Sequence, residues 1–365
     1  MTADLSDTRL CMTTSPTPGA VAILQLIGPG VEQVLSKLTG RGQWEAGRLY
    51  LVDFAGIDRG LAVLIRSGQS GVAQLMPHGG PRVVRSLIEA VGALGVLFDP
   101  QPDASTIFPE ADSPIQADAL VAVASASSPA AIDRLLTQPA LWRSAVQANI
   151  KITPLDRDKI QQESHLLDRL VTPPTVVVVG KPNVGKSTLT NRLMGRSVSL
   201  VADLPGTTRD WVGGVVEIAD VGVLSADVKR GGGPSSVAVR WVDTPGLRDS
   251  ADDIEQRAIG LASQAIASAE VLIVMRDPDN DWPDAGDLPR EPDIRVVNKA
   301  DLTEGHWPDA VSISAATGQG IEMLQRCVVD ALGLSQINRG ACWAFSDTLR
   351  RYVRGGITDL SDYLG

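Results

Sequence analysis

The sequence predicts an α/β fold in its second half, where a parallel sheet is flanked by helices. A small α+β domain and a reduced helical segment precede it. In the second half, short apolar runs alternate with helical patterns, which is typical of a parallel sheet covered on both faces. The first part has short apolar runs at 20–27 and 61–66 and a helical pattern at 81–95. The stretch 99–114, rich in Pro, Asp and Ser, separates the first domain from the helical segment after it.

Composition limits the class of protein. The net charge of −10 argues against nucleic-acid binding by bulk electrostatics, although a local basic patch would suffice for phosphate contacts. The three cysteines are widely spaced and are expected to be free thiols, as suits a reducing compartment. No signal peptide and no apolar run of membrane-spanning length is apparent. We therefore expect a cytoplasmic protein that does not contact a membrane.

These patterns divide the chain into four segments. They are an N-terminal α+β domain (1–105), a reduced helical segment (106–172), the main α/β domain (173–335) and a C-terminal helical tail (336–365). In the main domain we expect strands at 175–180, 237–243, 270–275, 294–301 and 310–315, and helices at 187–195, 252–269 and 320–333.

The stretch 180–187, Gly-Lys-Pro-Asn-Val-Gly-Lys-Ser, follows an apolar strand and opens a helix. This spacing is that of a phosphate-binding loop, in which glycines let backbone N–H groups approach the phosphates. Lys186 would reach the outer phosphates, and the Ser187 hydroxyl would contact Mg²⁺. The residues expected around the phosphates are Asn183, Val184, Gly185, Lys186, Ser187 and Thr188.

Two further motifs end apolar strands. In DTPG (243–246), Asp243 can hold Mg²⁺ directly or through water, and Gly246 can turn its N–H toward the terminal phosphate. In NKAD (298–301), the Asp301 carboxylate can accept from the ring N–H and the exocyclic amine of guanine, neither of which adenine offers there. The expected base-binding residues are Asn298, Lys299, Asp301, Ser314 and Ala315, the last two through backbone contacts to the guanine oxygen. The motifs together predict a P-loop G domain that binds GTP or GDP.

Hydrolysis needs a positioned water and a cation at the transferring phosphate. Either Thr207 or Thr208, in the block 203–210, could sense the terminal phosphate by spacing. Leu247 follows the DTPG motif and cannot orient water. The candidates for that task are Asp249, Asp252, Asp253 and Glu255, any of which could instead be a solvated helix start. Arg209 and Arg248 are candidate cations, although a structural role suits each as well.

The G domain resembles the MnmE/TrmE family of tRNA-modification GTPases through GKPNVGKST, GTTRD and DTPGLRDSADDIEQRAIG. The resemblance implies that Asn183 helps bind K⁺, which replaces an arginine finger, and that Thr207 lies in the loop around K⁺. It also implies that Thr208 binds Mg²⁺ and that Glu255 orients the water. The catalytic residues would then be Glu255, Thr208 and Gly246.

The segments 6–30, 77–95 and 115–136 are similar to the N-terminal and helical domains of the same family. This implies a homodimer activated by G-domain contact, formyl-tetrahydrofolate as a one-carbon donor, a flavoprotein partner, and modification of the wobble uridine of tRNA. The chain ends in SDYLG rather than in the family's Cys-x-Gly-Lys tail. The alternative is therefore a GTP-dependent switch that has lost tRNA chemistry and regulates another partner.

Overall fold

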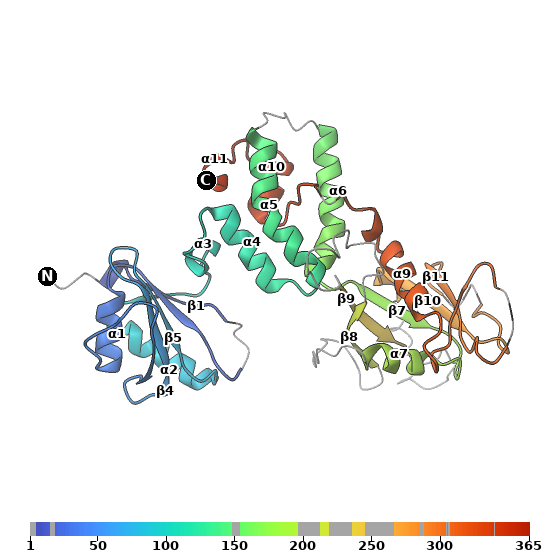
Figure 1. The fold of residues 1–365 in the computed structure, drawn as a ribbon, viewed down its shortest axis with the longest axis horizontal. Helices are drawn as coiled ribbons and strands as arrows, with labels where there is room; N and C mark the ends of the chain where they lie inside the picture. Colours follow the sequence, from blue (N-terminus) through green and yellow to red (C-terminus); the bar gives the residue numbers. More distant parts are fainter. Residues whose placement is uncertain are drawn as a thin grey trace. The chain divides into compact units, whose positions relative to one another are not determined.

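The computed structural model describes residues 5–14, 19–147, 154–195, 212–218, 236–244, 266–284, 286, 288–303, 305, 307–338 and 340–365. These residues form two compact units, residues 1–121 with 361–365 and residues 122–360, called unit 1 and unit 2 below. Figure 1 shows both units, each with its own sheet. The predicted boundaries at residues 105, 172 and 335 differ from the boundaries of these units, and the division into four segments stays a prediction.

Unit 1 is an α+β fold with a six-stranded sheet in the order β3-β4-β5-β2-β1-β6. Its strands are β1 (Arg9–Met12), β2 (Leu24–Ile27), β3 (Leu49–Asp53), β4 (Arg59–Arg66), β5 (Val72–Met76) and β6 (Leu97–Asp99). Its helices are η1 (Leu5–Asp7), α1 (Val31–Thr39), α2 (Pro81–Gly92), α3 (Ala104–Ile107) and α11 (Ser361–Leu364), while α4 (Pro114–Ser125) spans the boundary with unit 2. All strand pairs are antiparallel except β1 with β6. Buried apolar side chains of α1 and α2 pack with those of the strands in one core.

Unit 2 contains the predicted parallel sheet, in the order β12-β11-β10-β7-β9-β8. Its strands are β7 (Thr175–Val179), β8 (Val212–Ile218), β9 (Val237–Asp243), β10 (Val271–Arg276), β11 (Ile294–Val297) and β12 (Val311–Ser312). All pairs are parallel except the edge pair of β8 with β9. The fold class predicted from the alternation of apolar runs and helices is confirmed.

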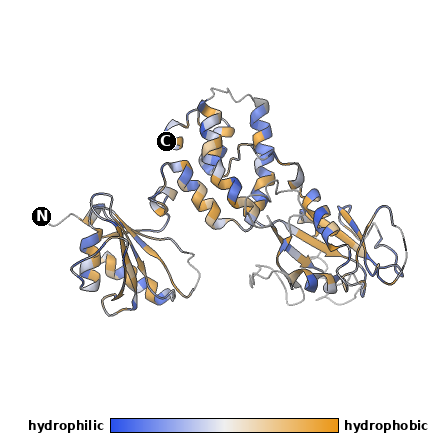
Figure 2. Cartoon of the chain, in the orientation of Figure 1, coloured by the Kyte–Doolittle hydropathy of each residue, from blue (hydrophilic) through white to orange (hydrophobic). Residues whose placement is uncertain are grey.

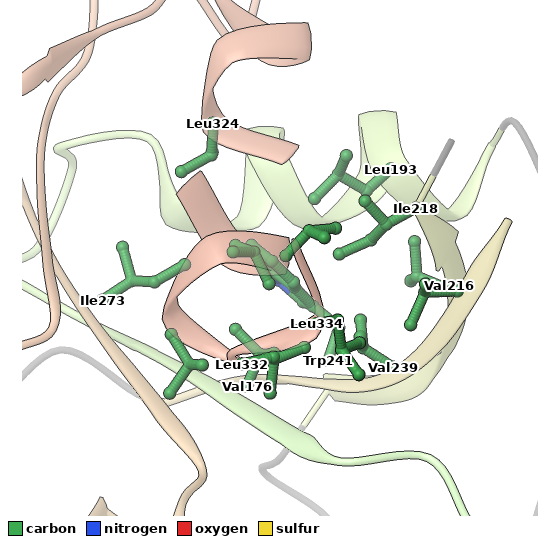
Figure 3. Close-up of a cluster of buried hydrophobic side chains, with 14 of the residues drawn as sticks. Val176, Leu193, Val216, Ile218, Val239, Trp241, Ile273, Leu324, Leu332 and Leu334 are labelled. Atoms are coloured by element: carbon green, nitrogen blue, oxygen red, sulfur yellow. The ribbon is translucent and has the colours of Figure 1, made fainter. Parts of the chain in front are cut away.

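The helices of unit 2 are α5 (Pro129–Gln147), α6 (Pro154–Val171), α7 (Lys186–Met194), α9 (Ile321–Ala331), η4 (Leu334–Gln336) and α10 (Asp347–Val353). Alternate valines of β7 enter two different cores. Val176 and Val178 join side chains from the neighbouring strands and helices, whereas Val177 and Val179 face a second cluster. Figure 3 shows part of the first cluster, with Val176 near Trp241 and Leu332. Residues 176–179 of β7 and 271–275 of β10 are apolar and buried because both faces of the sheet are covered (Figure 2).

The C-terminal segment before residue 360 packs on the helices α5 and α6. The Trp142 indole donates to the Trp343 carbonyl, and the Trp343 indole donates to Asp168. Arg350 pairs with the same carboxylate at 2.8 Å. These contacts, of which the first is buried and the other two partly exposed, fix the segment to the helical part of unit 2.

Candidate nucleotide site

The predicted site residues of unit 2 lie at one edge of its sheet. Strand β7 sits between β9 and β10 in the parallel sheet, and motif residues follow the carboxyl ends of β7, β9 and β11. In open α/β sheets, ligands bind outside these carboxyl ends where the strand order reverses. The topology therefore brings together motifs that are far apart in the sequence.

The phosphate loop between β7 and α7 requires glycine at two positions. A Cβ at Gly180 would stand 2.2 Å from the Met275 carbonyl oxygen, and one at Gly185 would stand 2.2 Å from Asn298 Nδ2. Gly185 also has a φ of +98°. Asn183 has the left-handed φ of 66° and an exposed side chain. Neither glycine could carry a side chain without displacing the neighbouring strand or Asn298.

Lys186 is buried, with 7% of its surface exposed. Its Nζ donates to the carbonyls of Gly180 at 2.8 Å and Lys181 at 3.1 Å. Burial lowers the pKa of Lys186, and the nearby charge of Asp243 opposes that shift. The ammonium is therefore folded onto its own loop, where a phosphate could take the place of the carbonyls.

Ser187 and Asp243 lie side by side. The Ser187 hydroxyl donates to Asp243 Oδ2 at 2.8 Å, while the buried Asp243 Oδ1 has no hydrogen-bond partner among the described residues. Burial raises the pKa of Asp243, although Ser187 and Lys186 act in the opposite direction. A buried carboxylate oxygen without a partner is costly. With the adjacent hydroxyl it makes a pair of oxygens of the kind that Mg²⁺ prefers.

Asn298 connects the phosphate loop to the loop at 314–319. Its Nδ2 donates to the Val184 carbonyl at 2.9 Å, and its Oδ1 accepts from the Ala315 N–H at 2.8 Å. The side chain is almost fully buried. Asn298 thus connects the two loops through one side chain.

Lys299 and Asp301 have different surroundings. The Lys299 ammonium pairs with the buried carboxylate of Asp277, which follows strand β10. Burial by itself raises the pKa of Asp277, but hydrogen bonds from Lys299 and Asn280 outweigh it, so that the pKa is lowered. Asp301 is exposed, and its carboxylate contacts no donor within the described part of the chain. Sequence reasoning missed Asp277; its only signal was an acidic residue directly after an apolar strand.

Ser314 and Ala315 lie in the loop where the sequence placed them, after β12. Their N–H groups, however, already donate within the protein, to the Gln319 carbonyl and to Asn298. Thr188 lies on the first turn of α7 and is exposed. Thr207, Thr208, Gly246 and Glu255 lie outside the described residues, and so do Leu247 and the other candidates for orienting water or supplying a cation.

Unit 1 has a hollow of about 360 Å³. It is lined by Met12, Thr14, Gly19, Val21, Ala22, Gly79, Pro81, Val84, Arg85, Ile88 and Glu89. The walls are mainly apolar, and α2 supplies one guanidinium and one carboxylate one turn apart. This hollow can accept a small ligand with an apolar ring and at least one charged group.

Within the described ranges, no helix combines the length and the apolar character that a membrane crossing requires.

Comparison with known proteins connects this geometry to a family. Residues 175–299 match the family described as 50S ribosome-binding GTPase. The whole chain is 29% identical to the tRNA modification GTPase MnmE of Methylococcus capsulatus, with 90% of that protein covered. The protein of the same name from Parvibaculum lavamentivorans is 29% identical over 90% of this chain and 82% of its own length. The one from Vibrio vulnificus strain YJ016 is 27% identical over 93% and 85%.

Two solved structures cover a smaller part. Era of Aquifex aeolicus bound to GDP and AlF₄⁻ is 27% identical over 43% of this chain and 56% of its own, with a TM-score of 0.32. The G domain of the FeoB iron transporter of T. maritima is 21% identical over 43% of this chain and 98% of its own, with a TM-score of 0.29. The motifs, the geometry at the sheet edge and the family match identify the domain around residues 175–299 as a P-loop GTPase that binds GTP and GDP. The chain resembles MnmE proteins over its whole length.

Proposed function

We propose that the chain is a Mg²⁺-dependent GTPase that is stimulated by K⁺, activated by dimerisation, and involved in tRNA modification as its relatives are by name. The observation that carries the metal assignment is the buried Asp243 Oδ1, which has no partner among the described residues, beside the Ser187 hydroxyl. Ser187, Asp243 and Thr208 would hold Mg²⁺, which neutralises charge on the phosphates when bound.

The residues of the chain itself would divide the remaining tasks. The Lys186 ammonium would donate to phosphate oxygens in place of the carbonyls of Gly180 and Lys181. The negative charge of the phosphate would stabilise this buried ammonium. Asp301, whose side chain is exposed, would accept from the guanine ring. We propose Glu255 as the residue that orients water and Gly246 as a donor to the terminal phosphate.

Potassium is assigned to Asn183 and Thr207. The exposed Asn183 side chain, on a loop residue with φ of 66°, supports this assignment because it is open to a ligand at the phosphate loop. GTP turnover measured in equal concentrations of KCl and NaCl tests it. Faster turnover in KCl is expected, and Asn183→Ala should remove the difference while GDP affinity remains. Equal turnover of the unaltered chain in the two salts would show the assignment to be wrong.

Glu255 is tested separately. Glu255→Ala should leave GTP affinity unchanged and slow hydrolysis in KCl, because only the water would lose its orientation. Asp253→Ala, two residues away, is the matched control and should hydrolyse GTP at the normal rate. Normal turnover of Glu255→Ala would remove it from the mechanism.

The hollow of unit 1 is where we propose a formyl-tetrahydrofolate-type ligand. Its apolar walls suit a ring system, and Arg85 could pair with a carboxylate of the ligand. Equilibrium dialysis against 5-formyltetrahydrofolate should show binding that Arg85→Ala weakens. No binding to the unaltered chain would exclude this ligand. We also propose that the chain forms a homodimer and binds a flavoprotein partner and tRNA. These three proposals rest on family resemblance alone.

A second candidate is a GTP-dependent switch without tRNA chemistry, in which Cys342 would not act as a nucleophile. Cys342, the last cysteine of the sequence, is partly covered in the fold, and burial raises its pKa to about 11. Such a thiol is protonated at neutral pH and is a poor nucleophile. Iodoacetamide at pH 8 should therefore label Cys342 far more slowly in the folded chain than in urea. Equal rates would remove this support for the alternative.

A further inference from the structure

Arg192 lies on helix α7, which follows the phosphate loop, and its side chain contacts the loop 314–319 after β12. Its Nε donates to the Ala315 carbonyl at 2.5 Å, and its Nη2 donates to the Ala316 carbonyl. Neither the phosphate motif nor the base motif includes this arginine. One guanidinium therefore holds two consecutive peptide carbonyls of the loop that is expected to bind guanine.

The N–H groups of this loop are almost all engaged. The Ser314 N–H donates to the Gln319 carbonyl, and the Ala315 N–H donates to Asn298 Oδ1. The N–H groups of Thr317 and Gly318 donate to the hydroxyl and the carbonyl of Ser314. The Gln319 N–H donates to the Thr317 hydroxyl. Across the described residues, the N–H of Ala316 has no such acceptor. It is the donor that the loop keeps available for a ligand.

The direction of that donor follows from Arg192. No cis peptide occurs in the described chain, so the Ala315 carbonyl and the Ala316 N–H point in opposite directions from one planar unit. Because Arg192 holds the carbonyl, the N–H is directed away from the guanidinium. The positive charge also polarises the peptide and makes its N–H a stronger donor.

We propose that Arg192 is a positioning residue for guanine recognition: by holding the Ala315 carbonyl, it directs the Ala316 N–H toward the 6-oxo group of the base. This inference rests on the proposed guanine-nucleotide function. It also gives a physical connection between the two ends of the nucleotide. The helix that follows the phosphate loop sets the orientation of the base loop, and Asn298 holds the same loop by accepting from the Ala315 N–H.

The test compares three diphosphates that differ in the purine. GDP and IDP both carry the 6-oxo group, and IDP lacks the 2-amine that Asp301 would bind. The diphosphate of 2,6-diaminopurine riboside keeps the 2-amine but replaces the 6-oxo acceptor by an amine donor, and its ring N1 carries no hydrogen. Dissociation constants are measured by calorimetry on the full chain, unaltered and as Arg192→Met. Loss of one oriented hydrogen bond predicts that Arg192→Met weakens GDP and IDP by about fivefold to tenfold. Its affinity for the diaminopurine diphosphate should not change.

Arg169→Met is the matched control. Arg169 also donates to a backbone carbonyl, that of Leu332, in the same unit but outside the nucleotide motifs. This variant should bind all three nucleotides as the unaltered chain does. A conservative variant, Arg192→Lys, supplies one donor group in place of the planar fork and should restore part of the GDP and IDP affinity. Ala316→Pro removes the N–H, although its ring also restricts the backbone, and should reproduce the pattern of Arg192→Met. Ala316→Gly keeps the N–H and is its control.

The outcomes separate the inference from the function on which it rests. If the unaltered chain binds ADP as well as it binds GDP, the proposed guanine site itself is wrong. If it prefers GDP, but Arg192→Met weakens all three nucleotides by the same factor, Arg192 only supports the fold and the inference is overturned. Unchanged affinities in Arg192→Met overturn it as well, whatever the result for Ala316→Pro.

Discussion

The sheets of the two units each contain a buried polar side chain, but these two side chains differ in whether their polar atoms have hydrogen-bond partners. In unit 1, Gln25 is buried within the sheet, and its amide donates to the carbonyls of Thr106 and Ile107 and accepts from Gln74. In unit 2, Asp243 is buried at the end of its strand with one oxygen unpartnered among the described residues. Since burial without a partner costs free energy, the first arrangement stabilises a fold, and the second is retained where a ligand completes it.

The same contrast appears in the strands. The first half of β4 in unit 1 alternates between exposed and buried residues, with Leu61 exposed and Ala62 in the core. β7 of unit 2 is covered on both faces, and its interior valines are all buried. A two-sided sheet leaves only its strand ends for polar chemistry, and that is where unit 2 carries its motifs.

The largest effect is expected at Asp243. Asp243→Asn removes the charge that would hold the metal, so Mg²⁺-dependent GTP turnover should fall about 100-fold or more, given that a metal supplies several kcal/mol of charge stabilisation. The melting temperature without Mg²⁺ should not fall, because an incompletely paired buried charge is removed. Glu217→Gln, at an exposed carboxylate on β8, is the control for turnover. Near-normal turnover of Asp243→Asn would contradict the claim that the buried carboxylate of unit 2 serves a ligand rather than the fold.

Gln25 should give the opposite pattern. Gln25→Leu leaves the two carbonyls and the Gln74 amide without their partner, which should destabilise the chain by about 2 kcal/mol in urea unfolding. GTP turnover should remain normal, since the change lies in unit 1. Gln43→Leu, at an exposed position of the same unit, should alter neither quantity. A loss of turnover in Gln25→Leu would mean that the two buried groups do not differ in role.

The smallest effect is expected for the ion pair of Asp277 with Lys299. The lowered pKa of Asp277 means that its stabilisation is complete above the ordinary carboxyl pKa and is lost as the pH falls through the folded-state value. Asp277→Asn should lower stability at pH 7 by about 1 kcal/mol, because Lys299 is partly exposed. The difference from the unaltered chain should shrink below about pH 4. Unfolding curves at neutral and at acidic pH check this, and a difference that is constant with pH would contradict it.

Much of the nucleotide site could be predicted because each motif follows its own strand. Ser187 and Asp243 were both expected as Mg²⁺ ligands, and they lie within hydrogen-bond distance of each other since parallel strands end at one edge. The contacts of Arg192 and Asp277 could not be predicted, because they join residues with no shared motif. They depend on how far a side chain reaches across packed loops.

The predictions for Thr207, Thr208, Gly246 and Glu255 remain predictions, since these residues lie outside the described part of the chain. In unit 1, the apolar runs predicted strands, but not that the Gln25 amide would donate to the carbonyls of Thr106 and Ile107 at the end of α3. A buried polar residue in a strand pattern does not indicate its partner.

The central claim is that the polar groups at the sheet edge of unit 2 form a guanine-nucleotide site with a metal. Its most direct test is calorimetric titration of the nucleotide-free chain with GDP and with ADP, each with and without Mg²⁺. We expect GDP to bind, ADP to bind far more weakly, and Mg²⁺ to tighten GDP binding in the unaltered chain but not in Asp243→Asn. Equal affinities for GDP and ADP, or a Mg²⁺ effect that survives in Asp243→Asn, would contradict the claim.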